Sequence, residues 1–325
     1  MIIKFGSFSE FEKDIRYVRD RVFVSEQGWS VGEVYDDADP SCIQLVAYKD
    51  ETPVGVARCV FDEAWHIGRV GVLKELRGLH IGVEIMRAML GHIDASGGGE
   101  ILLHSQIERQ GFYEALGFSV CGEPYLQGKI EHVPMRYNIV CQNGKITIRK
   151  MNDCLEDYTL MASWLSNPVV LKYYGGRDKP SNLEKATEKY RPRICGDSYV
   201  IPCIIEYDNN AVGYTQYYRN PIVDEPLVKE SLGGREYENP YGLDLFIGEP
   251  NYWSKGLGTA VVKLFVDYLL QNSIADIIFI DPQTWNKRAI RCYEKCGFKP
   301  VTVLEKRELH EGKYKDNLIM AIRSN

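Results

Sequence analysis

The clearest periodic pattern in the chain begins just after Trp253. Apolar side chains recur there at i, i+3, i+4 and i+7 and define one face of an amphipathic helix: Leu257, Ala260, Val261, Leu264, Phe265, Tyr268 and Leu269. Immediately upstream, "YGLDLFIGEP" (241–250) predicts a buried strand that ends at Gly248 and Pro250. Gly256 and Gly258 therefore lie where a strand passes into a helix.

The chain contains this arrangement twice. "RGLHIGVEIMRAMLGHI" (77–93) and "SKGLGTAVVKLFVDYLL" (254–270) both lead from a glycine-bearing turn into an amphipathic helix, and "FYEALGF" (112–118) and "CYEKCGF" (292–298) follow them. A repeat of about 180 residues that occurs twice predicts two copies of one domain rather than a solenoid.

The predicted domains are 1–140 and 141–325. Around the boundary, "RYNIV" and "KITIRKM" read as strands joined by the turn "QNG". Each half gives a strand, helices, several strands, the glycine turn, a long helix, a strand, a short helix and a last strand. The strands after the long helices are "EILLHSQ" and "DIIFIDPQT". This order predicts an α/β (α+β) domain with a mixed, mostly antiparallel sheet flanked by helices.

Composition narrows the function classes. A chain of 325 residues with 45% apolar and 26% charged residues is ordinary for two globular domains. A net charge of −6 argues against nucleic acid and gives slight support to a cationic ligand. Nine cysteines without a CxxC pair predict reduced thiols and no metal site. No signal peptide or run of eighteen apolar residues is present, so we expect no membrane association and a cytoplasmic protein.

The glycine turn at 254–259 has two interpretations from the residues alone. It is either a tight turn or a phosphate-binding loop, because a helix N-terminus presents unpaired N–H groups and favours anions. GxxxxGK[ST] is absent, and "GLGTAV" places Val261 where a dinucleotide fingerprint requires its third glycine. Neither common nucleotide motif is therefore present.

With the downstream "NKRAIRCYEKCGF", this turn resembles the GNAT family of acetyl-CoA-dependent N-acetyltransferases. The family pattern [QR]-x-x-G-x-[GA] falls on residues 253–258, and Trp253 departs from its first position. The resemblance implies acetyl-CoA as cosubstrate and no metal. It also implies that backbone amides hold the diphosphate, at the residues matching Ser254, Lys255, Gly256, Gly258 and Thr259. Glycine lets a backbone approach a ligand that closely.

Residues 146–325 resemble the aminoglycoside 6′-N-acetyltransferases through "WLSNPVVLKYYGGRD", "GLDLFIGEPNYWSKGLGT", "DPQTWNKRAIRCYEKCGF" and "ELHEGK". Acetylation requires a neutral amine, so a base must remove a proton. This half has one histidine, His310, which leaves a carboxylate as the expected base. Asp244 lies within an apolar strand, where a carboxylate is costly without a purpose or partner. The resemblance makes Asp244 the base.

The same resemblance implies four further roles. Asp281 binds a substrate amine, Asn286 contacts the pantetheine arm, and Tyr293 protonates the departing thiolate. A backbone N–H of Phe246 or Ile247 polarises the thioester carbonyl. Structural alternatives remain open: Asp281 can simply end a strand, Asn286 can cap a helix, and Tyr293 can belong to the core.

The expected substrate is a small cationic amine, specifically the 6′-amine of an aminoglycoside, acetylated by direct transfer. Residues 221–250 hold seven acidic and two basic residues, which would attract a polycation or form a solvated loop. Tyr173 and Tyr174 serve either as a platform for a sugar ring or as packing. The alternative substrates are a polyamine, another metabolite or a protein N-terminus. A monomer and a homodimer are both compatible with the sequence.

Residues 1–140 resemble a different GNAT branch, the ElaA/YjcF-type acetyltransferases, through "IRYVRDRVFVSEQGWS", "GRVGVLKELRGLHIG" and "HSQIERQGFYEALGF". Arg77, Gly78 and Gly82 match the CoA-binding pattern, but His80 stands where glycine is expected. Tyr113 would be this domain's acid. The sequence names no substrate here and leaves a non-catalytic CoA-binding or structural module as the alternative.

Overall fold

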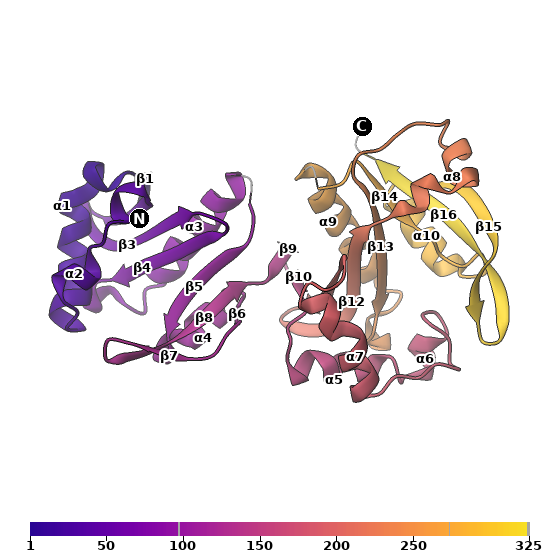
Figure 1. Cartoon of the computed structure of the whole chain (residues 1–325), viewed down its shortest axis with the longest axis horizontal. Helices are drawn as coiled ribbons and strands as arrows, with labels where there is room; N and C mark the ends of the chain where they lie inside the picture. Colours follow the sequence, from indigo (N-terminus) through magenta and orange to yellow (C-terminus); the bar gives the residue numbers. More distant parts are fainter. Residues whose placement is uncertain (97, 273, 324–325) are drawn as a thin grey trace. The chain divides into compact units, whose positions relative to one another are not determined.

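The computed structural model describes residues 1–96, 98–272 and 274–323. The chain forms two compact units, unit 1 (Met1–Asn138) and unit 2 (Ile139–Asn325) (Figure 1). In the described residues, no helix combines the length and apolar character that spanning a bilayer requires.

Unit 1 is a twisted sheet with helices on both faces (Figure 1). Its sheet order is β1-β2-β3-β4-β5-β8-β6, and β7 pairs with β8. The β4–β5 pair is parallel and the other described pairs are antiparallel. The strands are β1 (Ile2–Gly6), β2 (Ile43–Lys49), β3 (Thr52–Phe61), β4 (Trp65–Val72), β5 (Ile101–Gln106), β6 (Phe118–Val120), β7 (Tyr125–Gln127) and β8 (Ile130–Tyr137). The helices are α1 (Phe8–Arg19), α2 (Val31–Val34), α3 (Ile81–Ala95) and α4 (Gln110–Glu114), with a π-helix, η1, at Asp20–Glu26.

Alternating side chains of β2 explain the two helix layers of unit 1. Leu45 and Ala47 belong to the core cluster formed with α3, whereas Val46 and Tyr48 belong to the cluster formed with α1. Successive side chains of a strand point to opposite faces, so the two helices cover opposite faces of the sheet.

Unit 2 repeats the plan with one more strand at its start, which pairs with the strand that follows it. Its sheet order is β15-β16-β14-β13-β12-β11-β10-β9, with β13 and β14 parallel. The strands are β9 (Ile139–Asn143), β10 (Ile146–Lys150), β11 (Val200–Tyr207), β12 (Asn210–Arg219), β13 (Pro240–Ile247), β14 (Ile277–Ile280), β15 (Lys299–His310) and β16 (Lys313–Arg323). The helices are α5 (Leu155–Trp164), α6 (Pro168–Leu171), α7 (Leu183–Ile194), α8 (Pro226–Ser231), α9 (Leu257–Gln271) and α10 (Lys287–Lys295).

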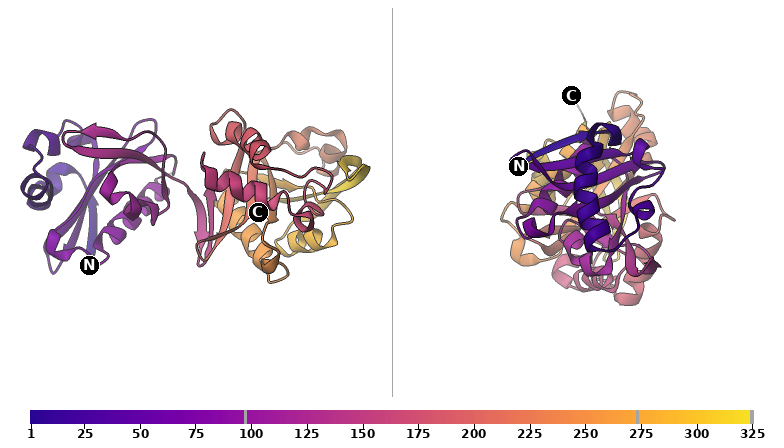
Figure 2. Two further views of the ribbon diagram at one scale, coloured as in Figure 1. Left: turned by 90° about the horizontal axis from the view of Figure 1, so that it is seen from below. Right: turned by 90° about the vertical axis from the view of Figure 1, so that its left-hand side faces the viewer.

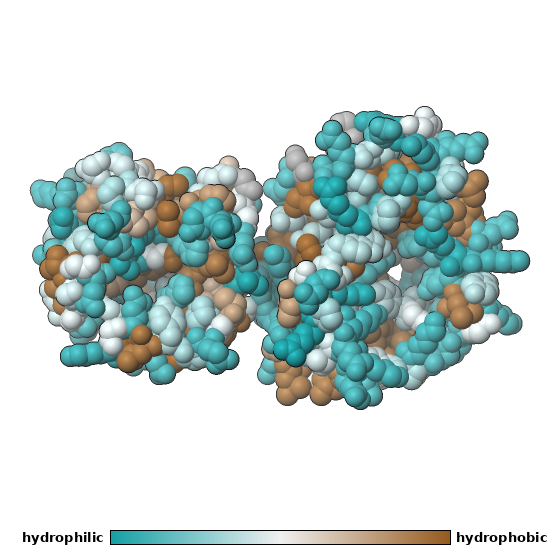
Figure 3. Space-filling model, viewed as in Figure 1, coloured by the Kyte–Doolittle hydropathy of each residue, from teal (hydrophilic) through white to brown (hydrophobic). Residues whose placement is uncertain are grey.

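The core of unit 2 also divides by sheet face. Val261 and Phe265 of α9 pack with Leu243 and Ile278 on one face, and α5 and α7 pack with Phe246 on the other. In the views of Figure 2, helices lie outside the sheet in each unit. Figure 3 shows hydrophilic residues over most of the visible surface of each unit, with hydrophobic residues interspersed.

The structure confirms the predicted fold class, because each unit has a mixed, mostly antiparallel sheet with flanking helices. The predicted hairpin exists as β9 and β10, which pair antiparallel. Both long helices exist; α9 begins at Leu257, the first apolar position of the predicted pattern, and α3 begins at Ile81. The residues before each helix form a turn with left-handed backbone.

Candidate active site

The two parallel strands of unit 2 pair over only part of their length. The described pairs join residues 240–242 of β13 to residues 277–279 of β14, and β13 continues to Ile247 without a partner on that side. Unit 1 has the same feature, since β4 pairs with β5 through Ile67 and Leu103 and then continues to Val72. In both units, unpaired backbone therefore lies at the carboxyl ends of two parallel strands.

The hydrogen bonds between β12 and β13 show which backbone N–H, that of Phe246 or that of Ile247, points away from β12. The Gly248 N–H donates to the Val212 carbonyl at 2.9 Å. Because successive residues of a strand direct their N–H groups to opposite sides, the Phe246 N–H points toward β12 and the Ile247 N–H points away from it. Of the two amides predicted for the thioester carbonyl, the Ile247 amide has the suitable direction.

Residues 253–256 form the last part of the connection from β13 to α9. Ser254 and Gly256 both have left-handed backbone, with φ of +60° and +84°, and Gly256 is the N-cap of α9. Among the residues that the structure describes, no side chain caps this helix, and the first helical bond runs from the Ala260 N–H to the Gly256 carbonyl. Ser254, Lys255 and Gly256 are exposed. The amides before Ala260 are thus available to an anion, which fits the diphosphate of CoA.

The matching loop in unit 1 has the same backbone conformation. Gly78 and His80 have φ of +81° and +60°, and His80 is the N-cap of α3. His80 therefore leaves the backbone of the turn unchanged. The Arg77 guanidinium forms an ion pair within the protein: it donates to both carboxylate oxygens of Glu26, at 2.6 and 2.8 Å. A cavity of about 670 Å³ is lined by this loop, by Gly82 and by Tyr113.

Asp244 is held by a side chain on the neighbouring strand. Gln216 Nε2 donates to Asp244 Oδ2 at 2.6 Å, and Gln216 Oε1 accepts from Arg193 at 2.6 Å and from the Tyr214 hydroxyl at 2.7 Å. Burial raises the pKa of Asp244, and the hydrogen bonds from Gln216 and Tyr218 oppose that rise. The carboxylate is therefore both oriented and more basic than an exposed aspartate.

Asp281 directly follows β14 and lies near two other carboxylates. Burial raises the pKa of Asp281 to about 7, with further contributions from Asp244 and Glu308, while a hydrogen bond from Asn317 lowers it. Asn317 Nδ2 lies 3.3 Å from Asp281 Oδ2 and 3.4 Å from Glu308 Oε2. Asp244, Asp281 and Glu308 thus form an acidic cluster at the end of the parallel strands.

Sequence reasoning did not identify Gln216, Glu308 or Asn317. Gln216 occupies an inward position of β12, where an amide in an apolar strand is the one available signal. Glu308 and Asn317 reach the cluster from a register irregularity in the β15–β16 ladder, between Leu304 and Glu308. No local pattern announces such an irregularity.

Asn286 and Tyr293 belong to α10. The Asn286 side chain accepts from the Ala289 N–H at 3.2 Å, so its capping role is observed. Tyr293 is 8% exposed, and burial is the main cause of its raised pKa, followed by Cys292, Asp244 and Asp281. The phenol therefore stays protonated at neutral pH near the acidic cluster.

The two adjacent tyrosines have different surroundings. The Tyr173 ring stacks on Trp285 with centroids 5.6 Å apart, and the Arg288 guanidinium lies 4.4 Å from Tyr173 and 4.2 Å from Trp253. Tyr174 instead packs on Phe246 at 4.7 Å. Tyr173 is thus tied to the loop, whereas Tyr174 supports the core.

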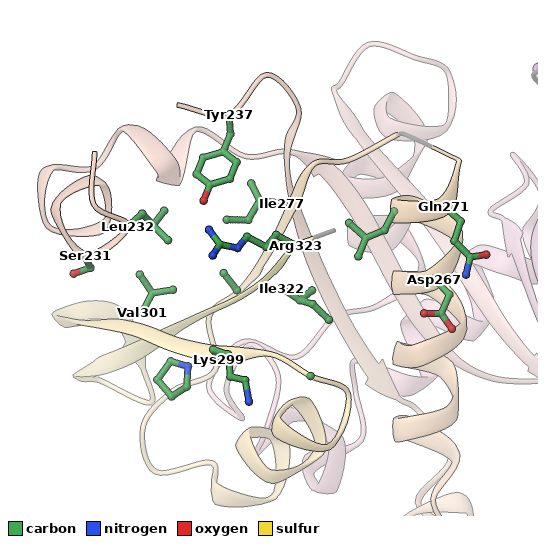
Figure 4. A pocket seen from close by; sticks show the side chains of 14 residues that line it. Ser231, Leu232, Tyr237, Asp267, Gln271, Ile277, Lys299, Val301, Ile322 and Arg323 are labelled. Carbon is green, nitrogen blue, oxygen red and sulfur yellow. The ribbon is translucent and has the colours of Figure 1, made fainter. Parts of the chain in front are cut away.

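A hollow of unit 2 lies away from these residues. It measures about 800 Å³ and is lined by the C-terminal part of α9, the start of β14 and the end of β16; Tyr237, Ile277 and Arg323 are among its lining residues (Figure 4). It contains none of the predicted site residues. Within 1–96, 98–272 and 274–323, no cluster of three or more histidine, cysteine or carboxylate side chains is arranged to hold a metal.

Comparison with known proteins finds relatives for both halves. Two acetyltransferase (GNAT) domain models match the chain, one over residues 153–306 and the other over residues 31–139. The aminoglycoside N(6′)-acetyltransferase type 1 of Klebsiella pneumoniae is 30% identical over 167 residues, which cover 50% of this chain and 79% of that protein.

Two further relatives come from other bacteria. A candidate acetyltransferase of Bacillus subtilis (strain 168) is 32% identical over 122 residues, which cover 36% of this chain and 83% of that protein. The crystal structure of Escherichia coli ElaA is 26% identical and covers 42% of this chain and 99% of that chain, with a TM-score of 0.39.

Proposed function

The chain belongs to the GNAT acetyltransferases and carries two such domains, and from this premise we propose that unit 2 acetylates the 6′-amine of an aminoglycoside. As a GNAT enzyme, the protein takes its acetyl group from acetyl-CoA, whose thioester supplies the electrophilic carbonyl. The loop 254–259 would hold the diphosphate through its backbone amides.

The observation that carries the proposal is the acidic cluster of Asp244, Asp281 and Glu308 beside the unpaired end of β13. Three carboxylates in a partly buried site favour a ligand with several ammonium groups over one with a single charge. The identity to an aminoglycoside acetyltransferase supports the same substrate class.

The residues have distinct roles in this proposal. Asp244, oriented by Gln216, accepts the proton that the substrate ammonium must lose. Asp281 and Glu308 hold further ammonium groups. The Ile247 N–H stabilises the negative charge that develops on the carbonyl oxygen, and Tyr293 delivers a proton to the departing thiolate. Transfer is direct, and Cys292 and Cys296 are not required as nucleophiles.

A thiol-release assay with acetyl-CoA and kanamycin tests the proposal. We expect Asp244→Asn to lower kcat at least 100-fold, the usual contribution of a general base. Glu188→Gln, on the exposed face of α7, is the control that should keep the wild-type rate. Turnover of spermidine or a peptide without turnover of kanamycin would refute the substrate class. A full rate for Asp244→Asn would refute the base.

A further inference from the structure

The two units differ at the positions of the acidic cluster. Gly82 of α3 and Gly258 of α9 occupy matching places and are 176 residues apart, and the same spacing places Gly68 of β4 opposite Asp244 of β13. On the next strand, Leu103 and Ile280 both pack in the core under the long helix. The residues that follow them are His104 and Asp281, so His104 occupies the position of Asp281.

Unit 1 therefore lacks both aspartates of unit 2. Gly68 offers no side chain, and the adjacent Arg69 is bound to chain atoms: it donates to the Val34 carbonyl at 2.9 Å, the Glu33 carbonyl at 2.7 Å and the Asp36 carboxylate at 3.0 Å. Arg58 and Arg69 line the cavity of unit 1. The cavity of unit 1 therefore lacks the pair of aspartates that would bind a polycation in unit 2.

His104 has the contacts expected of a proton acceptor. Its Nδ1 lies 2.8 Å from the Tyr125 hydroxyl, and it lines the same cavity as Tyr113 and the loop residues Gly78 and His80. When Nδ1–H donates to the Tyr125 oxygen, Nε2 carries the lone pair. Burial, together with His66 of β4 and His132 of β8, lowers the pKa of His104, which keeps the ring neutral at pH 7.

Aromatic rings line the cavity on one side of His104. The Tyr125 ring lies 5.5 Å from the His104 ring and 6.0 Å from the His132 ring, and Trp29 lies 6.1 Å from His132. His132 is fixed by a 3.0 Å hydrogen bond between its Nδ1 and the Ile130 carbonyl. This wall matches a planar ring better than a chain of ammonium groups.

We propose that unit 1 is a second acetyltransferase, in which His104 accepts the proton of a monoamine that carries an aromatic ring. This inference concerns unit 1 and does not depend on the substrate proposed for unit 2. The amine nitrogen forms a bond to the acetyl carbon, and the carbon–sulfur bond of the thioester breaks. The ammonium loses two protons: one passes to His104 and then to water, and the other reaches the thiolate through Tyr113.

A double dissociation tests the inference in the full chain, with 2-phenylethylamine and kanamycin as acceptors. We expect His104→Gln to lower acetylation of 2-phenylethylamine at least 100-fold and to leave kanamycin turnover unchanged. Asp244→Asn should have the opposite pattern. Loss of phenylethylamine turnover in Asp244→Asn but not in His104→Gln would overturn the inference, as would no phenylethylamine turnover by the wild type.

Two further measurements separate a chemical role from a structural one. NMR titration of the His104 ring should give a pKa below its ordinary value in the wild type, and an unshifted ring would contradict the inference. A Cβ at Gly68 would meet no atom within 4 Å, so the backbone there has room for a side chain to begin. The double variant Gly68→Asp/His104→Gln should acetylate 2-phenylethylamine at least tenfold faster than His104→Gln alone. A folded double variant without this recovery would count against His104 as the base.

Discussion

His80 and Gly256 adopt the same left-handed conformation at the N-caps of α3 and α9, with φ of +60° and +84°. An L side chain in this region is strained by about 1–2 kcal/mol, whereas glycine is not. Unit 1 thus retains the loop geometry with a residue that is poorly suited to it.

Adding a side chain at Gly256 and removing the side chain of His80 should change the stability of the two units in opposite directions. We expect Gly256→Ala to lower the free energy of unfolding of unit 2 by about 1 kcal/mol. His80→Gly should raise that of unit 1 by about 0.5 kcal/mol, because relief of strain exceeds the entropy cost of glycine. Urea titrations of the full chain measure both. A loss of stability in both variants would contradict the shared conformation.

The pKa of Asp281, raised to about 7, predicts a pH-dependent stability. An unfolded aspartate ionises near pH 4, so between about pH 4 and pH 7 the unfolded chain binds fewer protons than the folded one. Stability should therefore fall as the pH rises through this window and stay low above it. Asp281→Asn should remove this part of the dependence and be more stable than wild type at pH 8, by on the order of 1 kcal/mol or more.

Urea midpoints at pH 5 and pH 8 provide the measurement. Asp267→Asn, an exposed position on α9, is the matched control and should follow the wild type at both values. Equal pH dependence in Asp281→Asn and the wild type would show that Asp281 ionises normally in the folded protein.

The sequence predicted what depends on local pattern, and missed what depends on register. The period of α9, the strand around Asp244 and the glycine turn are all visible in consecutive residues, so the fold class followed from them. Gln216 and Glu308 reach Asp244 and Asp281 through pairing of distant strands. A one-residue shift in either ladder would turn those side chains to the other face, and no local signal fixes that choice.

Gln216 should act on the reaction through Asp244. Gln216→Leu removes the donor that lowers the pKa of Asp244, so the acid limb of the kcat profile should move to higher pH. Hydrogen bonds to charged groups contribute about 1.5–3 kcal/mol, so kcat should fall about tenfold or more. The KM for acetyl-CoA should stay unchanged. pH–rate profiles with kanamycin measure this shift.

Tyr214→Phe is the control for the Gln216 variant. It removes a different hydrogen bond of the same amide, the 2.7 Å bond from the Tyr214 hydroxyl to Gln216 Oε1, and leaves the bond to Asp244 in place. We expect lower stability with an unmoved acid limb. The same shift in both variants would mean that general loosening of the core, rather than the bond to Asp244, sets the profile.

Two ion pairs of similar length in unit 2 should differ widely in their effect on stability. Arg149 contacts Asp157 at 2.7 Å with side chains 19% and 2% exposed, whereas Lys145 contacts Asp208 at 2.8 Å with side chains 61% and 58% exposed. Arg149 also contacts Glu206 at 2.7 Å, so Arg149→Met leaves the buried Asp157 and the half-buried Glu206 without their cation and should cost about 3–5 kcal/mol. Lys145→Met should leave the free energy of unfolding close to that of the wild type, since exposed pairs are solvated and screened.

Because Asp157 also accepts from the Asn152 N–H at 2.7 Å, the double variant Arg149→Met/Asp157→Asn should recover part of the loss. Equal destabilisation by the two single variants, measured by urea titration, would show that burial does not decide the strength of these pairs.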